Sequence, residues 1–64
     1  MFYTIIQSHS DKPWTLVGQT YSMEGAIDVA RQSAARHGIS CEVRIGTRGA
    51  MRVYADGGCV RLTA

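Results

Sequence analysis

Residues 22–38 constrain the fold more than any other part of the chain, because they alone show helical periodicity. Apolar residues recur there at spacings of three and four, which places them on one helix face. This stripe consists of Met23, Ala26, Ile27, Ala30 and Ala34. Ser22 is a good N-cap, and Gly38 suits a left-handed C-cap. We therefore predict one helix over residues 23–37, whose mostly alanine face can lie close to a sheet.

The segments on either side of this helix alternate apolar and polar residues, which is typical of strands. Residues 2–7 and 14–20 flank a polar turn and predict an antiparallel hairpin. Residues 39–45 and the chain after them predict a meander of three strands, with turns near Gly49 and Gly57. The predicted fold class is α+β, order ββαβββ, with a single helix packed on one face of a mostly antiparallel five-stranded sheet. We favour the strand order 2-1-3-4-5, and pairing of the third strand beside the second stays open.

The two turns of the meander set the predicted strand registers. A loop of residues 47–49, with its glycine left-handed, places Val43 opposite Val53. A two-residue turn at residues 57–58 then places Val53 opposite Leu62. These registers predict a sheet face free of the helix that carries Glu42, Arg44, Arg52, Tyr54, Cys59 and Arg61.

Length and composition bound the classes of protein. The 64 residues make a single domain over residues 1–64, and a hydrophobic content of 45% argues against disorder. No apolar run approaches the roughly 20 residues that span a bilayer. Residues 1–6 show neither a basic leader nor a cleavage site, so no signal peptide is expected. We expect a soluble, cytoplasmic protein that does not engage a membrane.

The net charge of +2 is distributed unevenly along the chain. Residues 1–30 carry three acidic residues and one lysine, which sum to −2. Residues 31–64 carry six arginines and two acidic residues, which sum to +4. The folded molecule is therefore expected to be electrically bipolar, although a short chain also reaches such a split by chance.

The sequence contains no catalytic or metal-binding pattern. His9 is flanked by serines and an aspartate, but neighbours in one turn splay apart instead of converging as a catalytic triad does. Cys41 and Cys59 are too few for a disulfide framework and are predicted to be free thiols on opposite sides of the sheet. Neither histidine has zinc-ligand spacing to them. We predict a protein that is not an enzyme and that uses no cofactor or metal.

The predicted helix-free sheet face is the first candidate partner-binding surface. The register places Arg44 opposite Arg52, and like charges in such positions are unfavourable unless an anionic partner bridges them. Tyr54 beside Arg61 adds an option for stacking and cation–π contact. Such a face fits a phosphate backbone or an acidic protein patch. The alternative is a solvated face on which Glu42 partly neutralises the arginines.

The outward face of the predicted helix is the second candidate partner-binding surface. Glu24 and Asp28 lie one turn apart near the helix start and form a small acidic cluster. Such a cluster can mimic phosphates or engage a basic surface. The alternative is that both carboxylates simply interact with the helix dipole.

Several features combine into a resemblance to a known group of proteins. The strand of residues 2–7, the polar hairpin, the Ser22-Met23-Glu24 helix start and the arginine-bearing meander resemble small anti-CRISPR proteins of phages and mobile elements that act on type I CRISPR systems. The resemblance covers the whole chain in size and element order. It implies an inhibitor in the host bacterial cytoplasm that docks on the CRISPR surveillance complex (Cascade). Such inhibitors block target DNA binding or nuclease recruitment.

Many anti-CRISPR proteins mimic DNA through strong acidity, whereas this chain has a net charge of +2. A bipolar surface that contacts both acidic and basic patches of the complex fits this chain better than DNA mimicry.

Two other function classes stay open. One is a small nucleic-acid-binding domain that uses the arginine-lined sheet face. The other is a dimeric antitoxin-like module, since the first strand and the Ser-x-Glu helix start are similar to antitoxin-type ββαβ domains. The acidic middle loop of those domains is absent here. We expect a monomer or a homodimer, because the edge strand of residues 14–20 can pair with a copy of itself.

Overall fold

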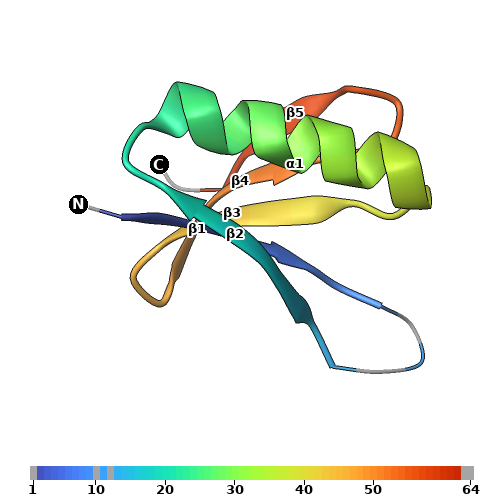
Figure 1. The fold of residues 1–64 in the computed structure, drawn as a ribbon, viewed down its shortest axis with the longest axis horizontal. Coiled ribbons are helices and arrows are strands. Elements are labelled where there is room, and N and C mark those ends of the chain that lie inside the picture. Colours follow the sequence, from blue (N-terminus) through green and yellow to red (C-terminus); the bar gives the residue numbers. More distant parts are fainter. Residues whose placement is uncertain (1, 10, 12, 63–64) are drawn as a thin grey trace.

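The computed structural model describes residues 2–9, 11 and 13–62. These residues form β1 (Tyr3–Gln7), β2 (Thr15–Thr20), α1 (Met23–His37), β3 (Cys41–Ile45), β4 (Arg48–Val53) and β5 (Cys59–Arg61). Figure 1 shows α1 lying on one face of the sheet. The predicted α+β class and the order ββαβββ are confirmed.

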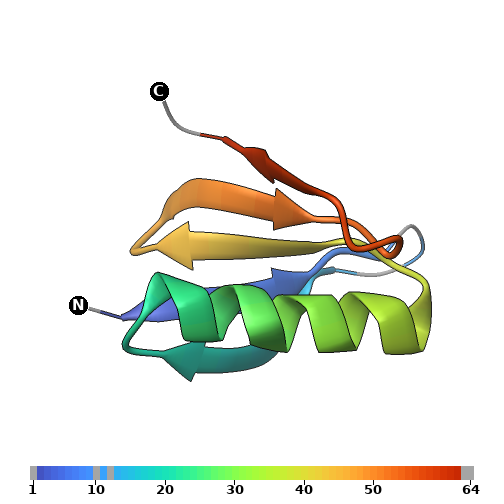
Figure 2. The ribbon, with the colours of Figure 1, turned by 90° about the horizontal axis from the view of Figure 1, so that it is seen from above.

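The strand order of the sheet is β2-β1-β3-β4-β5, and every neighbouring pair is antiparallel. The chain leaves β2, crosses the sheet through α1 and returns beside β1, as the favoured prediction had it. The two edges of the sheet are therefore β2 and β5 (Figure 2). The helix packs mainly over β1, β2 and β3, so β5 extends beyond the part of the sheet that the helix covers.

Both ends of α1 carry the caps that the sequence predicts. The Ser22 hydroxyl accepts a hydrogen bond from the backbone N–H of Gly25 at 3.1 Å. At the other end, Gly38 adopts φ 67°, and its N–H donates to the carbonyl of Ala34 at 2.8 Å. The bond to Ser22 gives a partner to a backbone N–H of the first helical turn, and the bond from Gly38 gives one to a backbone carbonyl of the last turn. These caps fix the helix bounds.

The core lies between the alanine face of α1 and the strands beneath it. Ala26, Ala30 and Ala34 are fully buried, as are Ile5 and Val43 on the central strands. Small side chains on the helix leave little volume between the two layers, so the helix backbone packs close to the sheet. The predicted close-packed alanine face is confirmed.

The predicted register between β3 and β4 was wrong. The turn that joins them consists of two residues, Gly46 and Thr47, because Ile45 pairs with Arg48. Gly46 has φ 64°, whereas Gly49 is not left-handed. A positive φ at the first turn position is what a type II′ hairpin requires. A bulge between Val43 and Arg44 completes the shift, so that Val43 pairs with Met51 and Cys41 with Val53.

The predicted register between β4 and β5 was also wrong. Val53 pairs with Cys59 and not with Leu62, and residues 54–58 form the connection. The N–H of Tyr54 donates to the carbonyl of Gly58 at 2.8 Å, and the carboxylate of Asp56 accepts from the N–H of Gly58 at 2.9 Å. These turn contacts, together with φ 94° at Gly57, determine where β5 begins.

This change of register also changes which side of the sheet each β5 residue faces. Cys59 and Arg61 pair with Val53 and Met51, whose side chains pack toward the helix. Directly paired residues point to the same face, so Cys59 and Arg61 lie on the helix side. All three residues of β5 are exposed. A strand exposed on both faces has no buried pattern to fix its register, which is why the apolar alternation misled the prediction.

The two cysteines lie on the same side of the sheet, which corrects the prediction of opposite sides. Cys41, Val53 and Cys59 are paired in a row across three strands. Two strand spacings separate the cysteines by about 10 Å, beyond the reach of a disulfide. Both thiols are free, with Cys41 buried and Cys59 exposed.

We expect the two thiols to differ sharply in reactivity. Burial raises the pKa of the Cys41 thiol, which a hydrogen bond with Ser33 only partly offsets. A raised pKa and an inaccessible sulfur both lower the amount of reactive thiolate. Titration of the native protein with a chromogenic disulfide reagent should therefore modify one thiol, and denaturant should release the second. The Cys59→Ser variant should not react in its native state, and rapid labelling of that variant would contradict the burial of Cys41.

Candidate functional site

One row of paired residues crosses all five strands on the face that α1 leaves uncovered. Leu16 pairs with Ile6, Ile6 with Glu42, Glu42 with Arg52, and Arg52 with Val60. We call these five residues the cross-strand row. Their strand neighbours Ile5, Val43 and Val53 pack toward the helix, so the row points to the opposite face. The row thus crosses the whole width of the uncovered face.

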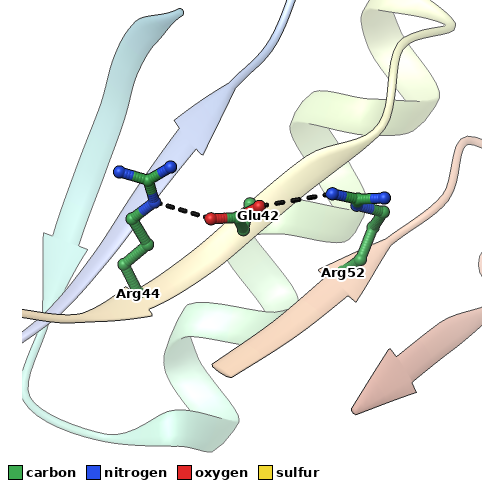
Figure 3. Close-up of polar contacts among 3 residues, drawn as sticks. All are labelled: Glu42, Arg44 and Arg52. Atoms are coloured by element: carbon green, nitrogen blue, oxygen red, sulfur yellow. Dashed lines mark hydrogen bonds and ion pairs between the residues drawn. The ribbon is translucent and has the colours of Figure 1, made fainter. Parts of the chain in front are cut away.

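Glu42 lies at the centre of this row and binds two arginines. Its Oε2 is 2.6 Å from Nε of Arg44, and its Oε1 is 3.4 Å from Nη2 of Arg52. Figure 3 shows the carboxylate between the two guanidinium groups. The predicted pairing of Arg44 opposite Arg52 was wrong, because Arg44 pairs with Gly49 and Glu42 takes the place opposite Arg52. Glu42 thus partly neutralises Arg44 and Arg52, as one of the two predicted alternatives for this face had it.

The ion pairs orient the arginines more than they stabilise the fold. The Glu42 side chain is 15% exposed, against 34% for Arg44 and 44% for Arg52. Ion pairs with this much solvent contact contribute about 0–1 kcal/mol each. Arg44 contacts Glu42 through Nε, so its two terminal nitrogens point away from the carboxylate (Figure 3). They are placed to donate to a partner's carboxylate or carbonyl group.

Apolar side chains lie on both sides of this charged centre. Leu16 is 58% exposed at one end of the row and Val60 47% at the other, with Leu62 beside it at 39%. Ile6 is only 2% exposed although it points away from the helix. The uncovered face therefore combines exposed apolar side chains with arginines, both of which protein–protein interfaces use, with the charges at its centre and the apolar side chains at its ends.

Gly49 allows the charged centre of this face, at Glu42, and its apolar end, at Leu62, to approach each other. A Cβ at this position would lie 3.1 Å from Oε2 of Glu42 and 3.3 Å from Cδ1 of Leu62. Both distances are shorter than ordinary van der Waals contact. The absence of a side chain here lets the carboxylate and the leucine pack over the backbone of β4.

The remaining predicted site residues are not brought together. Arg61 lies on the helix side opposite Met51, and Tyr54 lies in the connection after β4. The predicted pair of Tyr54 beside Arg61 is therefore wrong. Glu24 and Asp28 are exposed on α1, in the other layer of the molecule. Of the six predicted residues, only Arg44 and Arg52 share the uncovered face through contact with one group.

The sequence interpretation missed the apolar part of this face. Val60 and Leu62 were placed on the helix side because the register of β5 was wrong. Leu16 carried a usable signal, since it alternates with Thr15 and Val17 in an edge strand. A bulge between β1 and β2 nevertheless leaves Val17 and Gly18 both directed toward the helix. Only the paired strands show that Leu16 lies on the uncovered face.

The described residues contain no cluster of three or more His, Cys, Asp or Glu side chains that could hold a metal ion. His9 instead forms a hydrogen bond with the hydroxyl of Thr15, with Nε2 and Oγ1 at 3.1 Å. Within residues 2–9, 11 and 13–62, no helix has the length and apolar character needed to cross a membrane.

Fold and surface together define a small α+β protein with one helix-covered and one uncovered sheet face. Comparisons with known protein families, with curated proteins and with solved structures found no match.

Proposed function

We propose that this protein acts by binding and without catalysis, as an inhibitor of a type I CRISPR surveillance complex in a host bacterium. The cross-strand row is the observation that carries the binding role, because it combines apolar ends with an oriented charged centre. The choice of partner rests on the resemblance to anti-CRISPR proteins in size and element order. Docking of the uncovered face on one subunit blocks either target DNA binding or nuclease recruitment.

The charges of the uncovered face favour a protein partner over nucleic acid. Glu42 neutralises one of its two arginines, which leaves the three side chains with a net charge of +1. Arg61 points to the other side of the sheet. Binding to a phosphate backbone normally needs a concentrated patch of cations. The apolar ends of the row also have no counterpart in such a backbone.

The acidic residues of α1 provide a second contact in this proposal. Glu24 and Asp28 lie on the exposed surface of the helix, away from the arginines of the uncovered face. The first half of α1 thus presents negative charge, whereas the three charged side chains of the uncovered face have a net positive charge. A multi-subunit complex that has both acidic and basic patches can engage both.

Capture from a bacterial lysate tests this proposal directly. The tagged protein is incubated with lysate that contains an active type I CRISPR system, with and without nuclease, and bound proteins are identified by mass spectrometry. A surveillance-complex subunit should be captured stoichiometrically and should survive nuclease treatment. A shape-matched protein interface does not depend on bridging nucleic acid.

Two outcomes contradict the proposal. Bound proteins that vanish with nuclease would indicate a nucleic-acid surface. Capture without any subunit of the complex would exclude the proposed partner. As a control, the Arg48→Glu/Arg61→Glu variant reverses two exposed cations on the helix side of the sheet, outside both proposed contacts, and it should still capture the subunit.

A further inference from the structure

β2 is an edge strand without the usual protection against strand addition. It has six residues, and neither a charged residue nor a proline occurs among them. The other edge, β5, has only three residues and carries Arg61. Short edge strands and edge charges are the devices by which proteins avoid unwanted pairing. The outer edge of β2 is therefore the one that is open to another strand.

A groove runs alongside this edge on the helix side. Its volume is about 250 Å³, and it is lined by Val17 of β2 and by Val29, Gln32, Ser33, Arg36 and His37 of α1. Figure 2 shows β2 and α1 running in opposite directions along the same side of the molecule. The C-terminal half of the helix therefore borders the groove beside β2.

A strand added to β2 would place its side chains against this groove. Neighbouring strands lie about 4.7–4.9 Å apart, and alternate side chains point to the helix side. Such side chains would meet the apolar surface of Val17 and Val29 and then the polar rim of the helix. An edge strand beside a helix is a known arrangement for binding an extended peptide through its main chain, with pockets for alternate side chains.

The charge of the rim indicates which side chain fits there. Arg36 is exposed, and it takes part in neither of the ion pairs that the described residues form. An acidic side chain on the added strand would pair with it. A second copy fits less well, because its β2 brings no carboxylate.

We propose that the β2 edge and the adjoining groove bind an extended protein segment with an Asp or Glu side chain that pairs with Arg36. This site is separate from the uncovered face and does not rest on the proposed function. Either proposal can fail without affecting the other. The lysate capture tests the cross-strand row, whereas the peptide experiment below tests the β2 edge.

Titration of the isotope-labelled protein with short probe peptides tests this inference by NMR. The probe alternates Thr and Val and has one Glu in the middle of its Val face, and matched probes carry Gln or Lys there. The Glu probe should shift signals of β2 and of residues 29–37. It should bind about threefold to fivefold more tightly than the Gln probe, which corresponds to one exposed charged contact.

Substitutions on the helix locate the charged contact. The Arg36→Glu variant should reverse the preference toward the Lys probe, and Arg36→Gln should abolish it. The Arg31→Glu variant is the matched control, because Arg31 lies on the same helix but donates to the sulfur of Cys59, on the side of β5. It should keep the preference for the Glu probe.

Methylation of the probe's backbone tests pairing through the main chain. Two probes are methylated at alternate amides, each on a different edge. The probe whose methylated edge faces β2 should lose binding, and the other should retain it, because methylation removes the donors of one edge only.

Equal binding of the Glu, Gln and Lys probes, or no binding of the Glu probe, would overturn the inference. Equal binding of both methylated probes, or dimerisation of the free protein through β2, would overturn it as well.

Discussion

The Ala30→Leu variant is expected to lose about 3 kcal/mol of the free energy of unfolding, near the upper end of the usual cost of overpacking. Ala30 is fully buried at the middle of the helix face that packs on the sheet. The larger side chain forces the helix away from the central strands, where Ile5 and Val43 are also fully buried. A domain of this size has a total stability of only about 3–10 kcal/mol, so the loss is a large fraction of it.

Urea denaturation followed by circular dichroism measures this effect. The Ala35→Leu variant is the matched control, because Ala35 lies on the same helix but is exposed. Its free energy of unfolding should change by less than about 0.5 kcal/mol. Equal losses in both variants would mean that the alanine face is not the tightly packed contact between helix and sheet.

The Arg44→Glu/Arg52→Glu variant is expected to weaken binding to the proposed partner about a hundredfold, as the loss of two central interface residues does. The substitutions surround Glu42 with two further carboxylates in place of the guanidinium groups that it now binds. They remove the oriented donors and reverse the charge at the centre of the cross-strand row. Surface plasmon resonance with the purified surveillance complex at constant salt measures the loss.

Two further variants make this result interpretable. Arg44→Gln/Arg52→Gln removes the cations without adding carboxylates and should also bind weakly. Circular dichroism spectra like that of the unchanged protein would separate loss of contact from loss of folding in both variants. The Arg48→Glu/Arg61→Glu control changes the net charge equally and should bind as tightly as the unchanged protein. Full binding of both variants at positions 44 and 52 would remove the uncovered face from the proposed function.

The helix and the strand order were predictable because they depend on local and strongly patterned signals. Ser22 and Gly38 define the helix ends through their own backbone and side-chain chemistry. The alanine stripe shows which helix face is buried. The crossover from β2 through α1 to β3 leaves few arrangements, and pairing beside β1 gives the antiparallel sheet that is found.

The strand registers after the helix were not predictable from the same signals. The alternatives around Gly46 and Gly49 both join apolar residues on the helix side, so alternation does not distinguish them. The positive φ of Gly46 and the bulge after Val43 determine which of the two registers forms. The register of β5 depends on the hydrogen bond between the Asp56 carboxylate and the Gly58 N–H, and the pattern of apolar residues does not indicate this bond.

The candidate site was predicted only in part for the same reason. Arg44 and Arg52 were identified as surface residues of the correct face, since neither depends on the β5 register. Partial neutralisation by Glu42 was one of the two alternatives predicted for this face, but its position directly opposite Arg52 required the true pairing of β3 with β4. The apolar end formed by Val60 and Leu62 required the true pairing of β5, and it could not be found before that was known.

The exposed position of β5 has a consequence for how such a protein can evolve. The largest fully buried side chains belong to β1, β3 and β4 (Ile5, Cys41, Val43 and Val53), whereas every residue of β5 is exposed. Substitutions in β5 therefore remove little from the hydrophobic core. Val60, at one end of the cross-strand row, can vary with little loss of stability. Selection can thus adjust partner preference in the last strand while the rest of the sequence preserves the capacity to fold.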